Sequence, residues 1–381
     1  MADLPASGIR RFFDLLSSMD GVISLGVGEP DFVTPWNIRD AAIRSIEEGH
    51  THYTSNYGIP ALRHALSRSI RRHYGIEYDP ESEILITSGV SEGLDLALRV
   101  VLDPGDEVLV PDPAYVAYRP CVTLAGGVTV DVPTTMEHAF TLQIDDLERL
   151  VTDRTKALII NYPSNPTGAV MSREELMYVA DFAARHDLFV ISDEVYDRLV
   201  YGVGHTCFPS LPDMRHRTVL LGGFSKAYAM TGWRLGWIAA PAAVLEAAMK
   251  VHQYVMMSAP TPSQYAALEA LEHGEEDVRG MLSEYERRRR VMVDGLNAIG
   301  LECFEPRGAF YAFPSVRSTG LDDETFAEQL LMEEKVAVVP GSAFGVHGAG
   351  HVRCCYATAL PEIWEALERM QRFVRKVRGS S

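Results

Sequence analysis

Short apolar runs alternate with amphipathic stretches between about residue 83 and residue 240. A short apolar run is typical of a strand that is buried on both faces, and the stretches between the runs have the length and period of helices. Strands that alternate with helices predict a mostly parallel sheet covered by helices on both faces. The seven runs are Ile84–Thr87, Glu107–Val110, Val128–Val132, Ala157–Asn161, Phe189–Ser192, Val219–Leu221 and Trp237–Ala239.

The pattern changes after about residue 285, where helices and isolated strands predict a smaller α+β domain. The elements expected there are a charged helix at 277–298, a strand in Gly308–Phe313, a helix near 322–334, strands near 336–339 and 351–356, and a final helix near 361–377. We expect the N-terminal arm, with a short helix at Ile9–Leu16, to join this domain. The predicted division is therefore 1–47 for the arm and part of the small domain, 48–285 for the large domain, and 286–381 for the small C-terminal domain.

Composition and charge narrow the class of protein. The chain is 47% hydrophobic and 23% charged, with no long apolar stretch and no secretion signal, so we expect a cytoplasmic protein without a membrane span. Its net charge of −17 at pH 7 argues against a nucleic-acid partner. The five cysteines have no paired spacing, which fits reduced and mostly buried thiols better than disulfides or a zinc site, and we expect no metal.

Four consecutive arginines, Arg287–Arg290, look basic in isolation. However, Glu284 and Glu286 stand four residues before Arg288 and Arg290, which is the favourable order for ion pairs along a helix. We therefore interpret the run as the solvated face of a helix.

One lysine stands in surroundings suited to covalent chemistry. Lys226 lies in the glycine-rich segment Gly222–Lys226, directly after an apolar run, and Arg234–Gly236 follows. Glycine lets the backbone approach a ligand closely, and burial lowers the pKa of a lysine. Because the neutral amine is the form that attacks a carbonyl, Lys226 is a candidate Schiff-base former.

Other polar residues stand at the ends of the predicted strands, where ligands bind in parallel sheets. The turn Thr87–Gly93 leads into a helix, and free amides at a helix N-terminus suit a phosphate. Asp193 ends an apolar run, and a buried carboxylate needs a cation. Arg353 lies within another apolar run, and a buried arginine requires an anion. Structural alternatives are a helix cap for Asp193 and a salt bridge for Arg353.

Together these motifs resemble the site of class I/II aminotransferases of fold type I, which use pyridoxal 5′-phosphate (PLP). The lysine segment, Asn-Pro-Thr-Gly at 165–168 and Gly-Glu-Pro-Asp-Phe at 28–32 carry the resemblance, which extends over about residues 8–376. It is closest to the aromatic and aspartate aminotransferases of the bacterial and archaeal branch. It implies an α/β fold in which a large domain holds a mostly parallel seven-stranded sheet between helices, beside a smaller α+β domain.

The resemblance implies a role for each matching residue. The catalytic set is Lys226, Asp193 and Tyr196. The expected cofactor-binding residues are Tyr53, Val90, Ser91, Tyr115, Asn165, Asp193, Tyr196, Ser225, Lys226 and Arg234, and the expected substrate-binding residues are Gly28, Asn165 and Arg353. It also implies a cis peptide bond between Asn165 and Pro166.

In this scheme Lys226 carries PLP and then acts as a general base, while Asp193 keeps the ring nitrogen protonated. The phosphate is bound by Val90, Ser91, Ser225 and Arg234. The residues that contact the ring are Tyr115, which stacks on it, and Tyr196 and Asn165, which donate hydrogen bonds to its phenolic oxygen. Arg353 binds the substrate carboxylate, with Gly28 near it. Tyr53 reaches the phosphate of a neighbouring subunit, which implies a homodimer with shared active sites; an ordinary loop aromatic is the alternative.

The implied reaction is a ping-pong transamination. An L-amino acid, aromatic or aspartate, gives up its amino group, and a 2-oxo acid such as 2-oxoglutarate then receives it. Ser91 stands where many aspartate-specific members carry a lysine, which argues against strict use of aspartate. One alternative is a PLP-dependent lyase or decarboxylase on the same fold. Another is a non-catalytic ligand-binding regulator, which would need an added DNA-binding domain for which the short N-terminus leaves no room.

Overall fold

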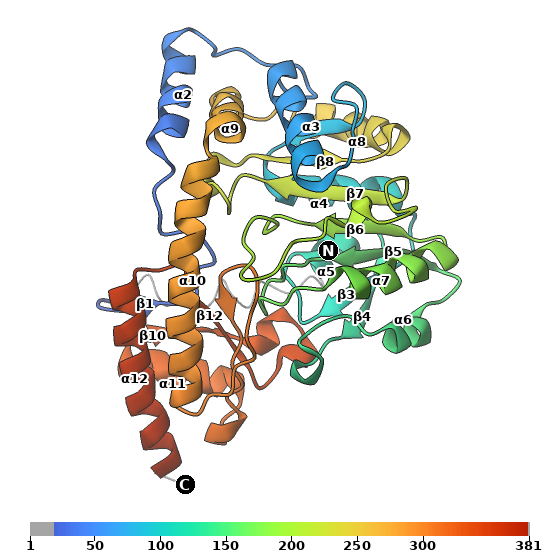
Figure 1. The fold of residues 1–381 in the computed structure, drawn as a ribbon. Coiled ribbons are helices and arrows are strands. Elements are labelled where there is room, and N and C mark those ends of the chain that lie inside the picture. The colour runs from blue at the N-terminus through green and yellow to red at the C-terminus, as the bar shows by residue number, and fades with distance from the viewer. Residues whose placement is uncertain (1–18, 380–381) are drawn as a thin grey trace.

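A seven-stranded sheet forms the centre of the computed structural model, which describes residues 19–379 (Figure 1). Its strands are β2 (Ile84–Thr87), β3 (Glu107–Asp112), β4 (Val128–Pro133), β5 (Thr155–Ile160), β6 (Phe189–Asp193), β7 (Thr218–Gly223) and β8 (Gly236–Ala239). Their order is β2-β8-β7-β6-β5-β3-β4. Only β8 runs antiparallel to its neighbours, so the predicted mostly parallel sheet and all seven predicted strands are confirmed.

Helices cover both faces of this sheet (Figure 1). The helices of this region are α2 (Trp36–Glu47), α3 (Pro60–Tyr74), α4 (Gly89–Val101), α5 (Tyr118–Leu124), α6 (Ile144–Leu150), α7 (Arg173–Arg185), α8 (Ala242–Val255) and α9 (Thr261–His273). Alternate residues of a strand point to opposite faces. Val108 and Val110 of β3 accordingly pack with α4 and α8, whereas Leu109 packs with α6 and α7. Such strands are apolar throughout because both faces are buried.

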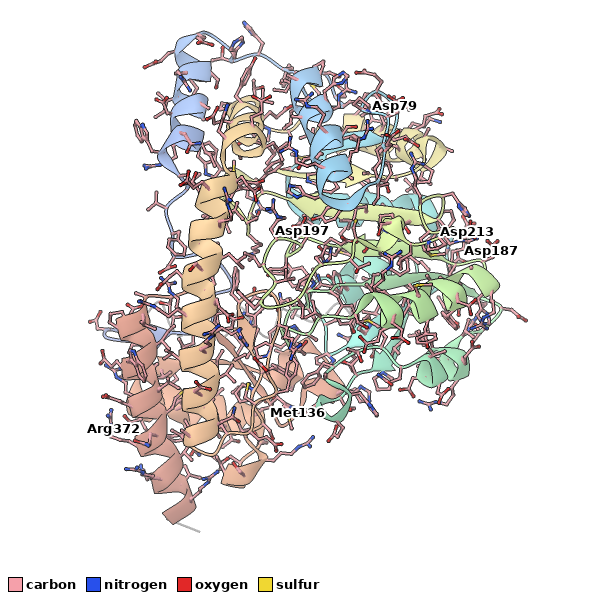
Figure 2. All side chains as sticks on the ribbon, viewed as in Figure 1. Asp79, Met136, Asp187, Asp197, Asp213 and Arg372 are labelled. Atoms are coloured by element: carbon pink, nitrogen blue, oxygen red, sulfur yellow. The ribbon has the colours of Figure 1, made fainter. Side chains whose placement is uncertain are left out.

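The C-terminal region forms a second, smaller unit around the long helix α10 (Glu275–Ala298). The other elements are α11 (Asp323–Glu334), α12 (Leu360–Gly379) and the strands β1 (Ile23–Ser24), β9 (Tyr311–Ala312), β10 (Val336–Ala337), β11 (Val339–Pro340) and β12 (Val352–Cys355). β11, β12 and β9 form an antiparallel sheet. On α12, Nη2 of Arg372 (Figure 2) lies 2.7 Å from Oε2 of Glu334 at the end of α11. The strand predicted at 336–339 is thus divided between two sheets.

Within the described part of the N-terminal arm, β1 pairs in parallel with β10 of this smaller unit. That the arm as a whole belongs to the small domain stays a prediction. The helix expected at Ile9–Leu16 lies outside the described residues. Helix α10 runs without a break from beside the large sheet to the small unit (Figure 1), so the helix itself does not mark a boundary near residue 285. The domain division near residues 47 and 285 therefore stays a proposal.

The arginine run on α10 is only partly solvated. The expected ion pairs at four-residue spacing form. However, Arg288 and Arg289 are buried, and each extends to another part of the chain. Arg288 pairs with Asp31 at 2.7 Å, and Arg289 pairs with Glu305 at 2.9 Å. The prediction of a solvated face is therefore wrong for these two, because consecutive helical residues point in different directions and a run of four reaches every side of the helix.

The five cysteines are free thiols; Cys121 is partly buried and the other four are buried, as expected. None of the helices between residues 19 and 379 combines the length and apolar character that a membrane span requires.

Candidate active site

A cavity of about 470 Å³ lies where β3, β5, β6 and β7 end, beside the start of α4. Residues from the arm and from the C-terminal unit complete its walls. The expected site residues that line it are Gly28, Val90, Ser91, Tyr115, Asn165, Asp193, Tyr196, Ser225, Lys226, Arg234 and Arg353. Residues far apart in the sequence therefore meet in one place.

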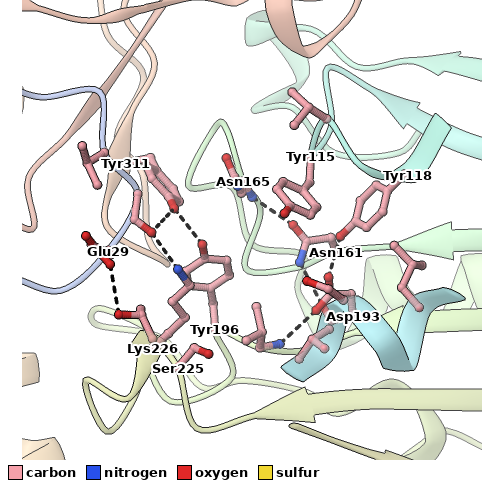
Figure 3. Close-up of a pocket in the computed structure, with 18 of the residues that line it drawn as sticks. Glu29, Tyr115, Tyr118, Asn161, Asn165, Asp193, Tyr196, Ser225, Lys226 and Tyr311 are labelled. Atoms are coloured by element: carbon pink, nitrogen blue, oxygen red, sulfur yellow. Dashed lines mark hydrogen bonds between the residues drawn. The ribbon is translucent and has the colours of Figure 1, made fainter. Parts of the chain in front are cut away.

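Lys226 follows β7 and points into the cavity (Figure 3). Its Nζ donates a hydrogen bond of 2.6 Å to the main-chain oxygen of Gly28. The rings of Tyr196 and Phe310 lie 5.8 and 5.7 Å from Nζ. Burial lowers the pKa of Lys226 to about 8. Its amine is thus much more readily deprotonated than that of an exposed lysine.

Asp193 is the last residue of β6 and is buried. Tyr118 Oη donates to its Oδ2 at 2.7 Å, and the N–H of Val195 donates to Oδ1 at 3.3 Å. Burial raises the pKa of Asp193 to about 6. Between residues 19 and 379 no Lys, Arg or His forms an ion pair with this carboxylate. A protonated ring nitrogen would supply the missing cation, so the residue fits PLP.

Arg353 lies in β12, buried, with the ring centroids of Tyr311 and Phe344 at 4.6 and 4.8 Å from its guanidinium carbon. Its Nη1 donates to Asn165 Oδ1 at 2.9 Å and its Nη2 to the Gly26 oxygen at 2.7 Å. Its Nε has no partner in the described part of the chain, and no carboxylate there forms a salt bridge with it. The guanidinium is thus held in place with hydrogen-bonding capacity left for an anion.

The start of α4 is shaped for an anion. The helix begins at Gly89, within the predicted turn Thr87–Gly93, so Val90 and Ser91 lie in its first turn. A Cβ on Gly89 would lie 2.9 Å from Nη2 of Arg234, and a Cβ on Gly236 would lie 2.6 Å from the nitrogen of Val90. Glycine at both positions therefore brings Arg234 and β8 close to the helix N-terminus. This combination of free amides, helix dipole and arginine suits a phosphate.

Several residues of the cavity were not assigned roles in the sequence analysis, and the side chains of three of them form hydrogen bonds with expected site residues. Asn161 Nδ2 donates to the main-chain oxygen of Asp193 at 2.8 Å (Figure 3). Asn161 directly follows β5, so the strand-end rule that selected Asp193 could also have selected it. Tyr118 contacts Asp193, and Tyr311 Oη lies 2.7 Å from Tyr196 Oη. These tyrosines carried no signal, because one begins a helix and the other comes from the C-terminal unit.

Two further expectations can be compared with the structure. The peptide bond between Asn165 and Pro166 is cis, as expected. Tyr53, by contrast, does not line the cavity of its own chain, and its side chain is 80% exposed. This position leaves it available to a second subunit.

Comparison with known proteins gives a consistent result. Residues 20–370 match the family described as aminotransferase class I and II. The chain is 48% identical over 373 residues to an aspartate aminotransferase of Pyrococcus abyssi, covering 97% of this chain and 96% of the relative. It is 47% identical over 373 residues to aromatic-amino-acid aminotransferase 2 of Thermococcus litoralis, with the same coverage. A solved aromatic aminotransferase from Pyrococcus horikoshii superposes with a TM-score of 0.92 at 46% identity, over 97% of this chain and 99% of that one.

Proposed function

Because the chain belongs to the PLP-dependent aminotransferase class I and II family, we propose that it transfers an amino group from an L-amino acid, aromatic or aspartate, to a 2-oxo acid such as 2-oxoglutarate by a ping-pong mechanism. The observation that carries the proposal is the convergence of Lys226, Asp193 and Arg353 on one cavity. Lys226 has a depressed pKa, Asp193 has no cation and Arg353 has no anion within the described residues. A cofactor and a carboxylate substrate would complete all three.

The cofactor would be held at both ends. Asp193 would bind its ring nitrogen, and the first turn of α4, with Val90 and Ser91, would bind its phosphate together with Ser225 and Arg234. The aromatic ring of Tyr115 would cover the cofactor ring, and Asn165 and Tyr196 would donate hydrogen bonds to its phenolic oxygen. When bound, PLP supplies the electron sink that makes the Cα proton of the amino acid acidic.

The substrate is oriented by Arg353, which binds its α-carboxylate through two hydrogen bonds. The Lys226 amine then removes the proton from Cα and returns a proton in the reverse half of the reaction. A base works best with a pKa near the operating pH, and the value of about 8 for Lys226 meets that condition. The Gly28 carbonyl, which accepts a hydrogen bond from Nζ, holds the amine on the arm side of the cavity.

The charges that this chain contributes to the cavity argue against strict use of aspartate. Among the described residues that line it, the Lys and Arg side chains are Lys226, Arg234 and Arg353, and each already has a role. Ser91 adds no charge, so this wall of the cavity offers no partner for a second substrate carboxylate. The second carboxylate of 2-oxoglutarate enters the same cavity, so its recognition, like that of aspartate, would depend on the neighbouring subunit. This chain alone therefore supports a donor range that includes aromatic L-amino acids and is not restricted to aspartate.

A single-turnover panel tests this function. The holoenzyme is mixed with Phe, Tyr, Trp, Asp or Ala, and loss of the visible absorbance of the lysine-bound cofactor is followed. The absorbance should fall with aromatic donors and not only with Asp, and it should return when 2-oxoglutarate is added. Release of product with donor alone, without need for an oxo acid, would instead favour a lyase.

Lys226→Ala should retain PLP but lack the visible absorbance of the lysine-bound cofactor, and kcat should fall at least about a thousandfold. Lys250→Ala is the matched control, because Lys250 is a surface residue paired with Glu246. Steady-state turnover of Lys226→Ala close to wild type would exclude this lysine as the base.

We also propose a homodimer in which Tyr53 of one subunit binds the phosphate in the other. The exposure of Tyr53 and its absence from the walls of its own cavity support this arrangement.

A further inference from the structure

The shortest hydrogen bond to the Asp193 carboxylate comes from a residue that the proposed mechanism leaves without a role. Tyr118, the first residue of α5, is 1% exposed, and its hydroxyl lies 2.7 Å from Asp193 Oδ2 (Figure 3). We propose that Tyr118 is a positioning residue that keeps Asp193 ionised and oriented toward the ring nitrogen of PLP. The inference rests on the proposed function.

Packing fixes the Tyr118 side chain. The Tyr115 ring meets it edge-on, with centroids 5.5 Å apart and an interplanar angle of 83°. Apolar residues of α4 and β3 bury the rest of the ring. Burial and the adjacent Asp193 carboxylate hold the pKa of Tyr118 far above its ordinary value. The phenol therefore remains protonated, and it can act only as the donor toward the carboxylate.

Within residues 19–379, no other titratable group donates a hydrogen bond to the Asp193 carboxylate. The titratable groups that act on Asp193 are Tyr115, Tyr118, Glu194, Tyr196 and Lys226. Glu194 turns away and pairs with His205 at 2.6 Å. Lys226 donates to the Gly28 oxygen instead. Among the described residues, Tyr118 is thus the one side chain that donates a hydrogen bond to this carboxylate.

The hydrogen bond from Tyr118 lowers the pKa of Asp193, so its loss has a predictable sign. Burial favours the protonated acid, whereas donation by Tyr118 favours the carboxylate and lowers the pKa of Asp193. Asp193 is ionised above its pKa and becomes protonated as the pH falls through that value. Loss of the hydroxyl leaves Oδ2 buried without its donor and raises the pKa. When Asp193 is protonated, it must lose its proton before it can pair with a protonated cofactor ring, and this weakens binding. In the variant this weakening begins at a higher pH than in the wild type.

The test compares the PLP affinity of the apoproteins by equilibrium dialysis from about pH 5 to about pH 8.5. Tyr118→Phe should move the acid side of the affinity profile upward by about one pH unit. Binding is then about fivefold weaker than wild type near pH 6 and about tenfold weaker near pH 5, and the two profiles meet at high pH. Free PLP titrates equally in both experiments, so its titration cancels in the ratio of the two affinities. The ratio therefore reports only the difference in titration between the two proteins.

Two controls separate this role from packing. In an Asp193→Asn background, Tyr118→Phe should have no pH-dependent effect, since the group through which it acts is gone. Tyr285→Phe removes a buried hydroxyl that has no partner in residues 19–379, and its profile should match wild type. A Tyr118→Phe profile equal to wild type at every pH, or weakened equally at every pH in both backgrounds, would overturn the inference.

If Tyr118→Phe does not fold, fluorotyrosine placed at position 118 provides the test in the opposite direction. It preserves the size of the ring but is a stronger donor, so the acid side of the profile should move to lower pH; no movement would reject the role. The single-turnover panel reports separately on the proposed function. An enzyme that fails to transaminate would refute that function whatever the affinity profile shows.

Discussion

Arg353 and Asp193 bring opposite charges to the same cavity without forming an ion pair in the described structure. Arg353 is held by Asn165 and by the Gly26 oxygen, while Asp193 is held by Tyr118. Direct pairing would satisfy both charges and leave no capacity for a ligand. Neutral hydrogen-bonding partners instead hold each side chain in place and leave its charge available for a ligand.

Arg353→Lys should raise KM for the amino acid about a hundredfold, or about 3 kcal/mol, because lysine cannot reproduce the two-bond contact with a carboxylate. PLP affinity should stay near wild type. Steady-state kinetics and PLP dialysis check the two parts, with Arg290→Lys on the exposed side of α10 as the control. An unchanged KM would remove Arg353 from substrate binding.

The depressed pKa of Lys226 predicts the pH dependence of cofactor capture. Only the neutral amine reacts with an aldehyde, so the rate at which apoprotein forms the lysine-bound cofactor should rise with pH and level off above about 8. Stopped-flow absorbance measures this rate. A rate that keeps rising toward pH 10 would indicate a lysine of ordinary pKa.

At the scale of elements, the phosphate site depends on how closely β8 approaches α4. Gly236 pairs with Thr87 on one side and Gly223 on the other, within the sheet. A Cβ there would lie 2.6 Å from backbone atoms of Gly89 and Val90, which cannot move without displacing the helix. The glycine is therefore required by the contact between two elements rather than by a turn.

Gly236→Ala should destabilise the protein by about 1–3 kcal/mol and weaken PLP binding, because the start of α4 must shift. Gly232→Ala is a matched control in the segment that precedes β8, since nothing lies within 4 Å of a Cβ added there. Thermal unfolding and PLP dialysis distinguish the two variants. Equal behaviour of both would show that the close approach is unimportant.

At the scale of the whole molecule, the cavity has walls from the arm, the large sheet and the C-terminal unit. Gly28 and Arg353 line it together with the ends of the parallel strands. β1 pairs with β10, so the arm and the C-terminal unit are joined by the sheet between them. Tyr53 is exposed on the large domain, which is consistent with the proposal that it contributes to the site of a second subunit.

Mixing variants tests the shared site. Tyr53→Ala and Lys226→Ala should each be nearly inactive at limiting PLP. When they are mixed and allowed to exchange subunits, the hybrid dimer contains one intact site, and about a quarter of wild-type activity should return. Mixing two samples of Lys226→Ala is the control. If activity does not return although hybrids form, Tyr53 does not serve a neighbouring subunit.

The sequence by itself determined the seven strands, the main helices and most of the cavity. These features depend on local periodicity and on motifs such as Gly222–Lys226, whose residues are neighbours in the chain. The rule that ligands bind at the ends of parallel strands then placed Asp193 and Thr87–Gly93 near one another. Local patterns suffice where an element is buried on both faces or where a motif is contiguous.

Only the tertiary structure decided which side chains satisfy one another across these elements. Tyr118 and Tyr311 reach Asp193 and Tyr196 through packing between distant segments, and no periodicity encodes such contacts. The same holds for Arg288, whose partner Asp31 lies in the arm. A hydrogen bond depends on distances of a few tenths of an ångström, which the chain acquires only when its elements pack together.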